Sequence, residues 1–307
     1  MICVTGAEPS TRLLAERLGA HARFPLQEAR LDRLEALDDD AFALLAGRPG
    51  LVVTCRRREE GGGFRGSEHE RAAVLRRALA GAPAYLDVEL AADEELRREL
   101  FRARGATRLL TSSHRFEPAG PELLRELARA LDAAPTDVTK LAVAVEDAAE
   151  LEPLRALASE RGAGRPAIRI GMGPAGIASR ALYGRFGSPF TYVAAAGSQP
   201  VAPGQLDVAT AETWRVARAA ELGPLALLGG TAVLRSPGPR IYNRVFAARG
   251  LGFVYLPVVT ARPLAALALL ERLGFAGASV TMPAKEALVP HLSLLDPDAR
   301  AAGAVNT

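Results

Sequence analysis

Lysine is almost absent from this sequence. Of its 38 basic residues, all but Lys140 and Lys285 are arginine. Arginine stays protonated under ordinary conditions, whereas a lysine amine can lose its proton when it is buried or lies near other cations. Because this chain uses arginine for almost all of its positive charges, the lysine at position 140 indicates that a free amine is needed there. Such an amine is a nucleophile that forms a Schiff base with a ketone.

Other residue types are also scarce, and each scarcity excludes a class of protein. Aromatic residues make up only 5% of the chain and the net charge is +3, so we expect no nucleic acid partner. No apolar stretch reaches the ~20 residues of a membrane span, and MICVTG does not resemble a signal peptide, so we expect a cytoplasmic protein without membrane contact. Cys3 and Cys55 lie in apolar runs and are expected to be buried and reduced. No Cys/His spacing suggests a metal site.

Strand-like and helix-like segments alternate along residues 1–222. This alternation predicts parallel βαβ units, and eight such units in this length predict a TIM barrel. The last helix of this domain is expected within residues 210–222. The predicted strands cover residues 1–5, 25–32, 50–56, 84–90, 107–114, 137–143, 166–172 and 190–194.

A second block follows over residues 223–307. It begins with a strand-like run, continues with a helix over 238–250, a strand over 253–259 and a helix over 262–274, and ends with GASVTMPAKEALV and GAVNT. The sequence therefore predicts an α/β protein in which a (β/α)8 TIM barrel, residues 1–222, precedes a small α/β domain, residues 223–307.

Polar and charged side chains gather at the ends of four consecutive predicted barrel strands, and Lys140 lies within the next strand. The C-terminal ends of barrel strands build the active site of a TIM barrel. Because burying an unpaired charge in a barrel is costly, these groups must pair with each other or with a ligand. The residues are Glu28, Arg30 and Asp32, then Thr54 and Arg56, Asp87 and Glu89, Ser112 and His114, with Lys140 within the sixth strand.

The residue types at these strand ends suggest acid–base chemistry around Lys140. His114 ends the preceding strand and can carry a proton in both directions near neutral pH. Glu89, one strand further round, could fix the tautomer of that histidine. Arg180 suits a carboxylate through its planar fork, and Gln205 could bind hydroxyl groups. The three remaining histidines, His21, His69 and His291, are interpreted as surface residues.

The segment GMGPAG, residues 171–176, matches G-x-G-x-x-G. A dinucleotide site would need an acidic residue about 20 positions later. No Asp or Glu occurs from Ile177 to Gln205. We therefore interpret the glycines as a tight loop over the barrel mouth.

Seven motifs together resemble type I 3-dehydroquinate dehydratase. They are EARLD, TCRRREEGG, YLDVEL, SSHRF, DVTKLA, MGPAGIASR and APGQ, in family order. The resemblance implies cofactor-free and metal-free dehydration of 3-dehydroquinate in the shikimate pathway, with 3-dehydroquinate as the small-molecule partner. The sequence is compatible with a homodimer but does not determine the oligomeric state. Two positions depart from the family pattern: Arg115 follows the histidine, and Val201 stands where a serine commonly occurs.

The same resemblance assigns roles to individual residues. Lys140 would form the imine, His114 would act as general acid and base, and Glu89 would orient His114. The implied substrate-binding residues are Glu28, Arg30, Arg56, Arg180 and Gln205.

The second block resembles the substrate-binding domain of shikimate dehydrogenase. The resemblance rests on SPGPRIYN (236–243), SVTMPAKEAL (279–288) and GAVNT (303–307). It implies that Ser236, Thr281, Lys285 and Asn306 belong to a shikimate pocket. Fused dehydratase–dehydrogenase proteins share this domain order. The catalytic Asp and the NADP-binding domain of that family do not occur in this chain, so we expect weak or no shikimate binding and no dehydrogenase activity.

Two alternatives to the dehydratase stay open. One is another class I Schiff-base lyase of the aldolase type, which the set of His114, Arg180 and Gln205 disfavours. The other is a non-catalytic protein that binds shikimate-pathway metabolites, which intact Lys140, His114 and Glu89 disfavour.

Overall fold

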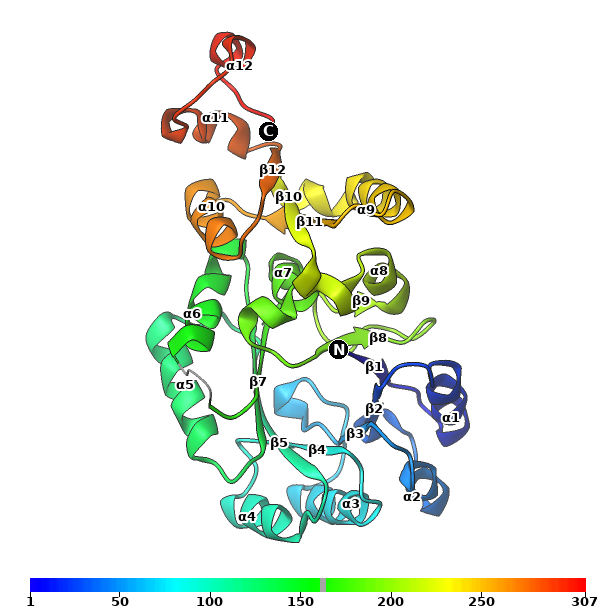
Figure 1. Cartoon of the computed structure of the whole chain (residues 1–307). Helices are drawn as coiled ribbons and strands as arrows, with labels where there is room; N and C mark the ends of the chain where they lie inside the picture. Colours follow the sequence, from blue (N-terminus) through cyan, green and yellow to red (C-terminus); the bar gives the residue numbers. More distant parts are fainter. Residues whose placement is uncertain (161–163) are drawn as a thin grey trace.

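The computed structural model describes residues 1–160 and 164–307 (Figure 1). Each of the eight predicted barrel strands is present and overlaps its predicted range, because each is a short apolar run bounded by turn residues. The strands are β1 (Ile2–Gly6), β2 (Leu26–Arg30), β3 (Leu51–Thr54), β4 (Tyr85–Glu89), β5 (Arg108–Arg115), β6 (Val138–Ala144), β7 (Ala167–Met172) and β8 (Thr191–Ala194).

These strands form one curled parallel sheet. Its order is β7-β6-β5-β4-β3-β2-β1-β8-β9, where β9 (Leu206–Asp207) is a short edge strand. Consecutive strands pair in parallel and β1 also pairs with β8, as a TIM-barrel-like fold requires. Among the described residues no pairing joins β7 to β8, so the barrel has a seam at this point.

Helices cover the outside of the curled sheet. Helix α5 (Pro121–Ala133) is representative: Pro121 is at its first turn, and Leu124, Ala128 and Leu131 form its buried stripe. Helix α3 (Glu68–Ala80) begins with a capping box between Ser67 and Glu70. The remaining barrel helices are α1 (Thr11–Ala20), α2 (Asp39–Leu45), α4 (Glu94–Ala103), α6 (Glu152–Glu160) and α7 (Ile177–Ala181).

The last predicted barrel helix is interrupted. Helix α8 (Val208–Thr213) ends before Arg215, and a 3-10 helix follows at Val216–Glu221. Arg215 has φ 53°, a left-handed conformation that breaks the helix. Its guanidinium donates to the backbone oxygens of Leu251 and Phe253. These tertiary hydrogen bonds explain why residues 210–222 do not form one helix.

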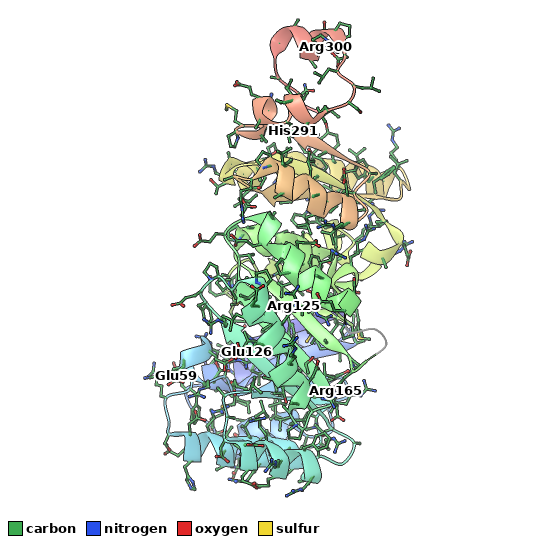
Figure 2. The ribbon with its side chains drawn as sticks, turned by 90° about the vertical axis from the view of Figure 1, so that its left-hand side faces the viewer. Glu59, Arg125, Glu126, Arg165, His291 and Arg300 are labelled. Atoms are coloured by element: carbon green, nitrogen blue, oxygen red, sulfur yellow. The ribbon has the colours of Figure 1, made fainter. Side chains whose placement is uncertain are left out.

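The second block forms a separate three-stranded parallel sheet with the order β11-β10-β12. Figure 2 shows this sheet and its helices above the barrel, with the segment that carries His291 and Arg300 farthest from it. The elements are β10 (Gly223–Gly229), α9 (Gly238–Ala248), β11 (Phe253–Val259), α10 (Pro263–Arg272), β12 (Gly277–Val280), α11 (Ala284–Ala287) and α12 (Pro297–Ala302).

Burial confirms one expectation from the sequence and corrects another. Cys3 and Cys55 are free and buried, as expected. His21, expected at the surface, is buried instead. Its Nδ1 lies 3.0 Å from the Arg17 carbonyl oxygen and its Nε2 accepts from the Ala196 N–H, so the imidazole links helix α1 to a loop distant in sequence. In the described ranges, no helix combines the length and apolar character needed to cross a membrane.

Candidate active site

A cavity at the C-terminal ends of the barrel strands gathers the predicted site residues. All of the predicted catalytic and substrate-binding residues of the barrel line it, with the exception of Glu89. Apolar walls come from Ala142, Ile170, Met172 and Tyr192. A concave site with an apolar wall and a few convergent polar groups is typical of a small-molecule site.

Lys140 lies on the floor of this cavity. It is the third residue of β6, pairs in register with Ser112 and Ile168, and is 6% exposed. Its Nζ lies 3.2 Å from an Oδ2 oxygen of Asp87 and 4.2 Å from the centre of the Tyr192 ring. The amine is therefore held at one point between a carboxylate and an aromatic face.

Asp87 on β4 connects three of the polar side chains on this floor. Its Oδ2 accepts from Arg56 Nη2 at 2.7 Å as well as from Lys140, and its Oδ1 accepts from the Ser112 hydroxyl at 2.6 Å. Burial opposes the ionisation of this carboxyl, but the charges of Arg56 and Lys140 outweigh it and hold the pKa of Asp87 well below its usual range. Asp87 thus stays charged and anchors the two cations.

His114 lies above Lys140, near the end of β5. Its Nδ1 is 3.0 Å from Oε2 of Glu60, and the same oxygen accepts from the backbone N–H of His114 at 2.8 Å. Glu60 ends a 3-10 turn, Arg58–Glu60, that follows β3. Because Glu60 occupies Nδ1, the nitrogen left for other chemistry is Nε2.

This contact corrects the role predicted for Glu89. Both oxygens of Glu89 are engaged elsewhere: Oε2 accepts from Arg71 at 2.6 Å, and Oε1 accepts from Arg56 at 3.2 Å and from the Arg57 N–H at 3.1 Å. Glu89 pairs in register with Ser112, two residues before the histidine. Glu89 therefore lies too deep and is too fully paired to orient His114, and Glu60 does so from the loop above.

The sequence contained a signal for Glu60 that the strand-end argument missed. The residue lies within REEGG, immediately before Gly61 and Gly62. Gly61 has φ 77°, and a Cβ atom on Gly62 would lie 1.9 Å from the Arg56 carbonyl oxygen. These two glycines permit the tight return of the loop that points Glu60 into the cavity.

Electrostatics prepare this pair for proton transfer. Burial lowers the pKa of His114 well below its usual value, and the charges of Arg56 and Lys140 lower it further. Burial raises the pKa of Glu60 to about 7. A neutral imidazole beside a carboxyl that titrates near neutrality can exchange protons with a bound molecule.

Arg180 and Gln205 reach the cavity from the far side of the barrel. Arg180 is on α7 and 2% exposed; its Nη2 donates to the Pro203 carbonyl oxygen at 3.1 Å, and its buried Nε has no hydrogen-bond partner among the described residues. Burial lowers the pKa of this guanidinium to about 10. Gln205 donates to the Thr5 hydroxyl at 3.3 Å and accepts from the Val201 N–H at 2.9 Å. Arg180 is thus a buried cation with a donor available to an anion.

The remaining predicted residues of the first two strands are also held by hydrogen bonds. Glu28 is 3% exposed and accepts from the hydroxyls of Thr5 at 2.8 Å and Thr54 at 2.7 Å. Arg30 forms a two-pronged ion pair with Asp32 at 2.8 and 2.7 Å. Both side chains are fixed before any ligand arrives.

The GMGPAG segment forms the expected tight loop at the barrel mouth. Gly173 has φ 94° and its N–H donates to the Pro203 carbonyl oxygen at 3.0 Å. A Cβ atom on Gly204 would lie 2.2 Å from the Gly173 oxygen, so the loops after β7 and β8 touch backbone to backbone.

The four predicted residues of the second block come from the segments that follow β10 and β12 and from the C-terminal segment. Ser236 lines a hollow against α8 together with Trp214, and its hydroxyl accepts from the Gly238 N–H at 3.1 Å. Lys285 and Asn306 line a different hollow. Thr281 follows β12, and its N–H donates to the Leu228 carbonyl oxygen at 2.8 Å.

Within the described ranges, no group of three or more His, Cys, Asp or Glu side chains has an arrangement that could hold a metal ion.

Comparison with known families yields two matches along the chain. The family model described as type I 3-dehydroquinase matches residues 2–216, and that of the shikimate dehydrogenase substrate binding domain matches residues 228–307.

Similar proteins of known description agree with these matches. A bifunctional 3-dehydroquinate dehydratase/shikimate dehydrogenase of Arabidopsis thaliana is 30% identical over 95% of this chain, which spans 49% of that relative. A 3-dehydroquinate dehydratase of Pyrobaculum aerophilum is 35% identical over 68% of this chain and 67% of its own length. The structure of the Geobacillus kaustophilus 3-dehydroquinate dehydratase superposes with a TM-score of 0.62 at 25% identity, covering 69% of this chain and 88% of that one.

Proposed function

This chain belongs to the type I 3-dehydroquinase family, and we propose from that membership that it dehydrates 3-dehydroquinate to 3-dehydroshikimate through an imine on Lys140. The observation that carries the proposal is the convergence of Lys140, His114 and Arg180 on one cavity. This reaction requires a buried amine, an imidazole that can accept and donate a proton, and a guanidinium that can bind an anion.

We propose that Arg180 binds the substrate carboxylate and so sets its orientation. The partnerless Nε of this residue supports the assignment, because a buried donor without an acceptor is costly until a ligand supplies one. Glu28 and Gln205 present oxygen acceptors toward hydroxyl groups. Holding the ring in this way converts attack by the amine into an effectively unimolecular step.

In the proposed chemistry, the unprotonated Lys140 Nζ adds to the C3 carbonyl carbon. The carbonyl oxygen takes up one proton from Nζ and one from solvent and leaves as water, which gives an iminium; the final hydrolysis returns the second proton to solvent. The iminium withdraws electrons from C2, so His114 Nε2 can remove a C2 proton. The resulting enamine expels the C1 hydroxyl, which takes that proton from His114 and leaves as water. A second water then hydrolyses the iminium, which releases the product and restores the amine.

We assign Asp87 and Glu60 supporting roles. Asp87 anchors Nζ at 3.2 Å, below the space where the ketone would lie. Ionised Glu60 accepts the Nδ1 proton at 3.0 Å, which leaves Nε2 free to act as a base. Arg56 carries positive charge close to both and is itself fixed by Asp87.

Borohydride reduction in the presence of 3-dehydroquinate tests the proposal. Only two lysines occur in the chain, so peptide mapping can assign the reduced adduct without ambiguity. We expect the adduct on Lys140, with loss of activity, and an unchanged result in the matched variant Lys285→Ala. Activity that survives complete reduction would refute the imine. Substrate binding without an adduct would favour the metabolite-binding alternative, and adduct formation followed by carbon–carbon cleavage would favour the aldolase alternative.

We propose in addition that residues 1–222 form the dehydratase domain and residues 223–307 a shikimate dehydrogenase-like domain that contributes weak shikimate binding at most. The match of residues 228–307 to the shikimate dehydrogenase substrate binding domain supports the assignment of this domain. NADPH oxidation by this chain with 3-dehydroshikimate, lost in Lys285→Ala, would contradict it. The cytoplasmic location and the homodimer stay predictions.

A further inference from the structure

The seam of the barrel lies beside the residue proposed to bind the substrate carboxylate. Neighbouring barrel strands are joined by backbone hydrogen bonds, but in the described part of the chain none of these pairings joins β7 to β8. Helix α7 follows β7 and carries Arg180 into the cavity. The position of Arg180 therefore depends on whatever holds α7 against the sheet.

Helix α7 is too short to hold itself in place. It has five residues, Ile177–Ala181, all of them buried. Isolated helices of this length are unstable, so its geometry must come from tertiary packing.

The packing on the outside of α7 comes from the second sheet. Strand β11 contacts both α7 and the turn Pro174–Gly176 before it, and Figure 1 shows α7 between the barrel strands and that sheet. Ile177 and Ala181 belong to the same buried cluster as Val254 and Leu256 of β11.

A buried polar contact fixes the end of the same strand to the barrel. The Thr260 hydroxyl, just after β11, donates to Asp147 at 2.9 Å, and the Ala261 N–H donates to Asp147 at 2.7 Å. Asp147 is 7% exposed and follows β6, the strand of Lys140. Strand β11 is therefore attached to the barrel at two points, the loop after β6 and helix α7 after β7.

We propose that the second sheet serves the barrel as an outer wall that positions Arg180, with Leu256 as the positioning residue. This inference rests on the proposed dehydratase function. It gives residues 223–307 a role that requires no ligand of their own. Loss of the wall would displace the guanidinium without removing it, and a misplacement of about 1 Å can cost roughly 10²-fold in rate.

Two leucines in neighbouring strands of the same sheet provide a matched pair of variants. Leu256 on β11 and Leu228 on β10 are both 0% exposed. Leu256 belongs to the cluster with α7, whereas Leu228 belongs to a cluster built mainly from residues of the second block, such as Val280 and Leu288. Truncation to alanine removes the same atoms from the same sheet in each case, but only Leu256→Ala opens space against α7.

The test is a double-mutant cycle in the full chain. We expect Leu256→Ala to lower kcat/KM for 3-dehydroquinate about 10- to 100-fold, mainly through KM, and Leu228→Ala to change it less than about threefold. In an Arg180→Ala background, Leu256→Ala should have little further effect, because its consequence passes through Arg180. Equal losses in the two leucine variants, or full additivity with Arg180→Ala, would overturn the proposal.

Hydrogen exchange separates failure of this inference from failure of the proposed function. Leu256→Ala should lose amide protection in residues 177–182, whereas Leu228→Ala should not. If the parent chain shows no turnover, the dehydratase proposal fails and the exchange result still decides whether the second sheet holds α7. Unchanged protection in Leu256→Ala would show that α7 does not need the second sheet.

Discussion

His114 Nδ1 lies 3.0 Å from an oxygen of Glu60, and that oxygen also accepts the backbone N–H of the same histidine. A double contact of this kind fixes both the ring and the strand end that carries it. Glu60, which comes from a loop, is therefore the partner of the proposed acid–base residue. Glu89 pairs instead with Arg56 and Arg71.

We predict that Lys140→Arg is as inactive as Lys140→Ala. Arginine can keep the ion pair with Asp87 and the charge above Tyr192, but it has no amine that can lose its proton and form an imine. Steady-state assays of 3-dehydroshikimate formation check this, with Lys285→Arg as the matched control. Turnover by Lys140→Arg near the parent rate would mean that only the charge matters at this position.

We predict that His114→Ala forms the imine and then turns over slowly. Lys140 and Asp87 are untouched by the change, whereas the removal of the C2 proton loses its base, a loss typically worth about 10²–10⁴-fold. Intact-mass spectrometry after borohydride quenching should find the adduct accumulated in this variant. His69→Ala, an exposed histidine on α3, is the control. Absence of any adduct in His114→Ala would place the histidine before imine formation.

We predict that kcat/KM of the parent falls as the pH drops through about 7, the pKa of Glu60 raised by burial. Below that pH Glu60 is protonated and donates a hydrogen bond to Nδ1. The proton of the neutral imidazole then lies on Nε2, so this nitrogen can no longer act as a base. In Glu60→Gln the amide does not titrate, so the fall should move to the lower pH at which His114 itself becomes charged.

The neighbouring Glu59→Gln serves as the control for this profile. Glu59 is exposed and pairs with Arg57 at 3.0 Å, so its replacement should leave the profile of the parent unchanged. A profile that shifts in Glu89→Gln but not in Glu60→Gln would restore the role that the sequence suggested for Glu89.

We predict that Arg71→Met destabilises the protein by about 3–5 kcal/mol, because it leaves a buried carboxylate without one of its cations. Arg71 and Glu89 are 0% exposed and lie 2.6 Å apart. Chemical denaturation measures the change. Arg76→Met on the same helix removes an exposed pair with Glu99 and should have little effect. Equal stability of the two variants would show that Glu89 is satisfied by Arg56 and the backbone alone.

The sequence by itself determined the order of the barrel strands and singled out residues that lie close together. Eight apolar runs separated by helix formers gave parallel strands at the predicted places, because strand formation here depends on local apolar pattern. The rarity of lysine singled out Lys140, and strand-end position singled out His114, Arg56 and Glu28. All of these residues line one cavity.

Only the tertiary structure decided which carboxylate meets which base. Strand parity predicted the face of the sheet on which Glu89 lies. It did not predict how deep in the barrel this side chain lies, because that depends on the register between strands. Glu60 could not be placed by parity, because its loop turns at two glycines and its reach depends on the path of the chain. The burial of His21, the break at Arg215 and the packing of β11 on α7 likewise depend on contacts between segments far apart in the sequence. No local pattern encodes these contacts, since each is fixed by the way complete elements pack.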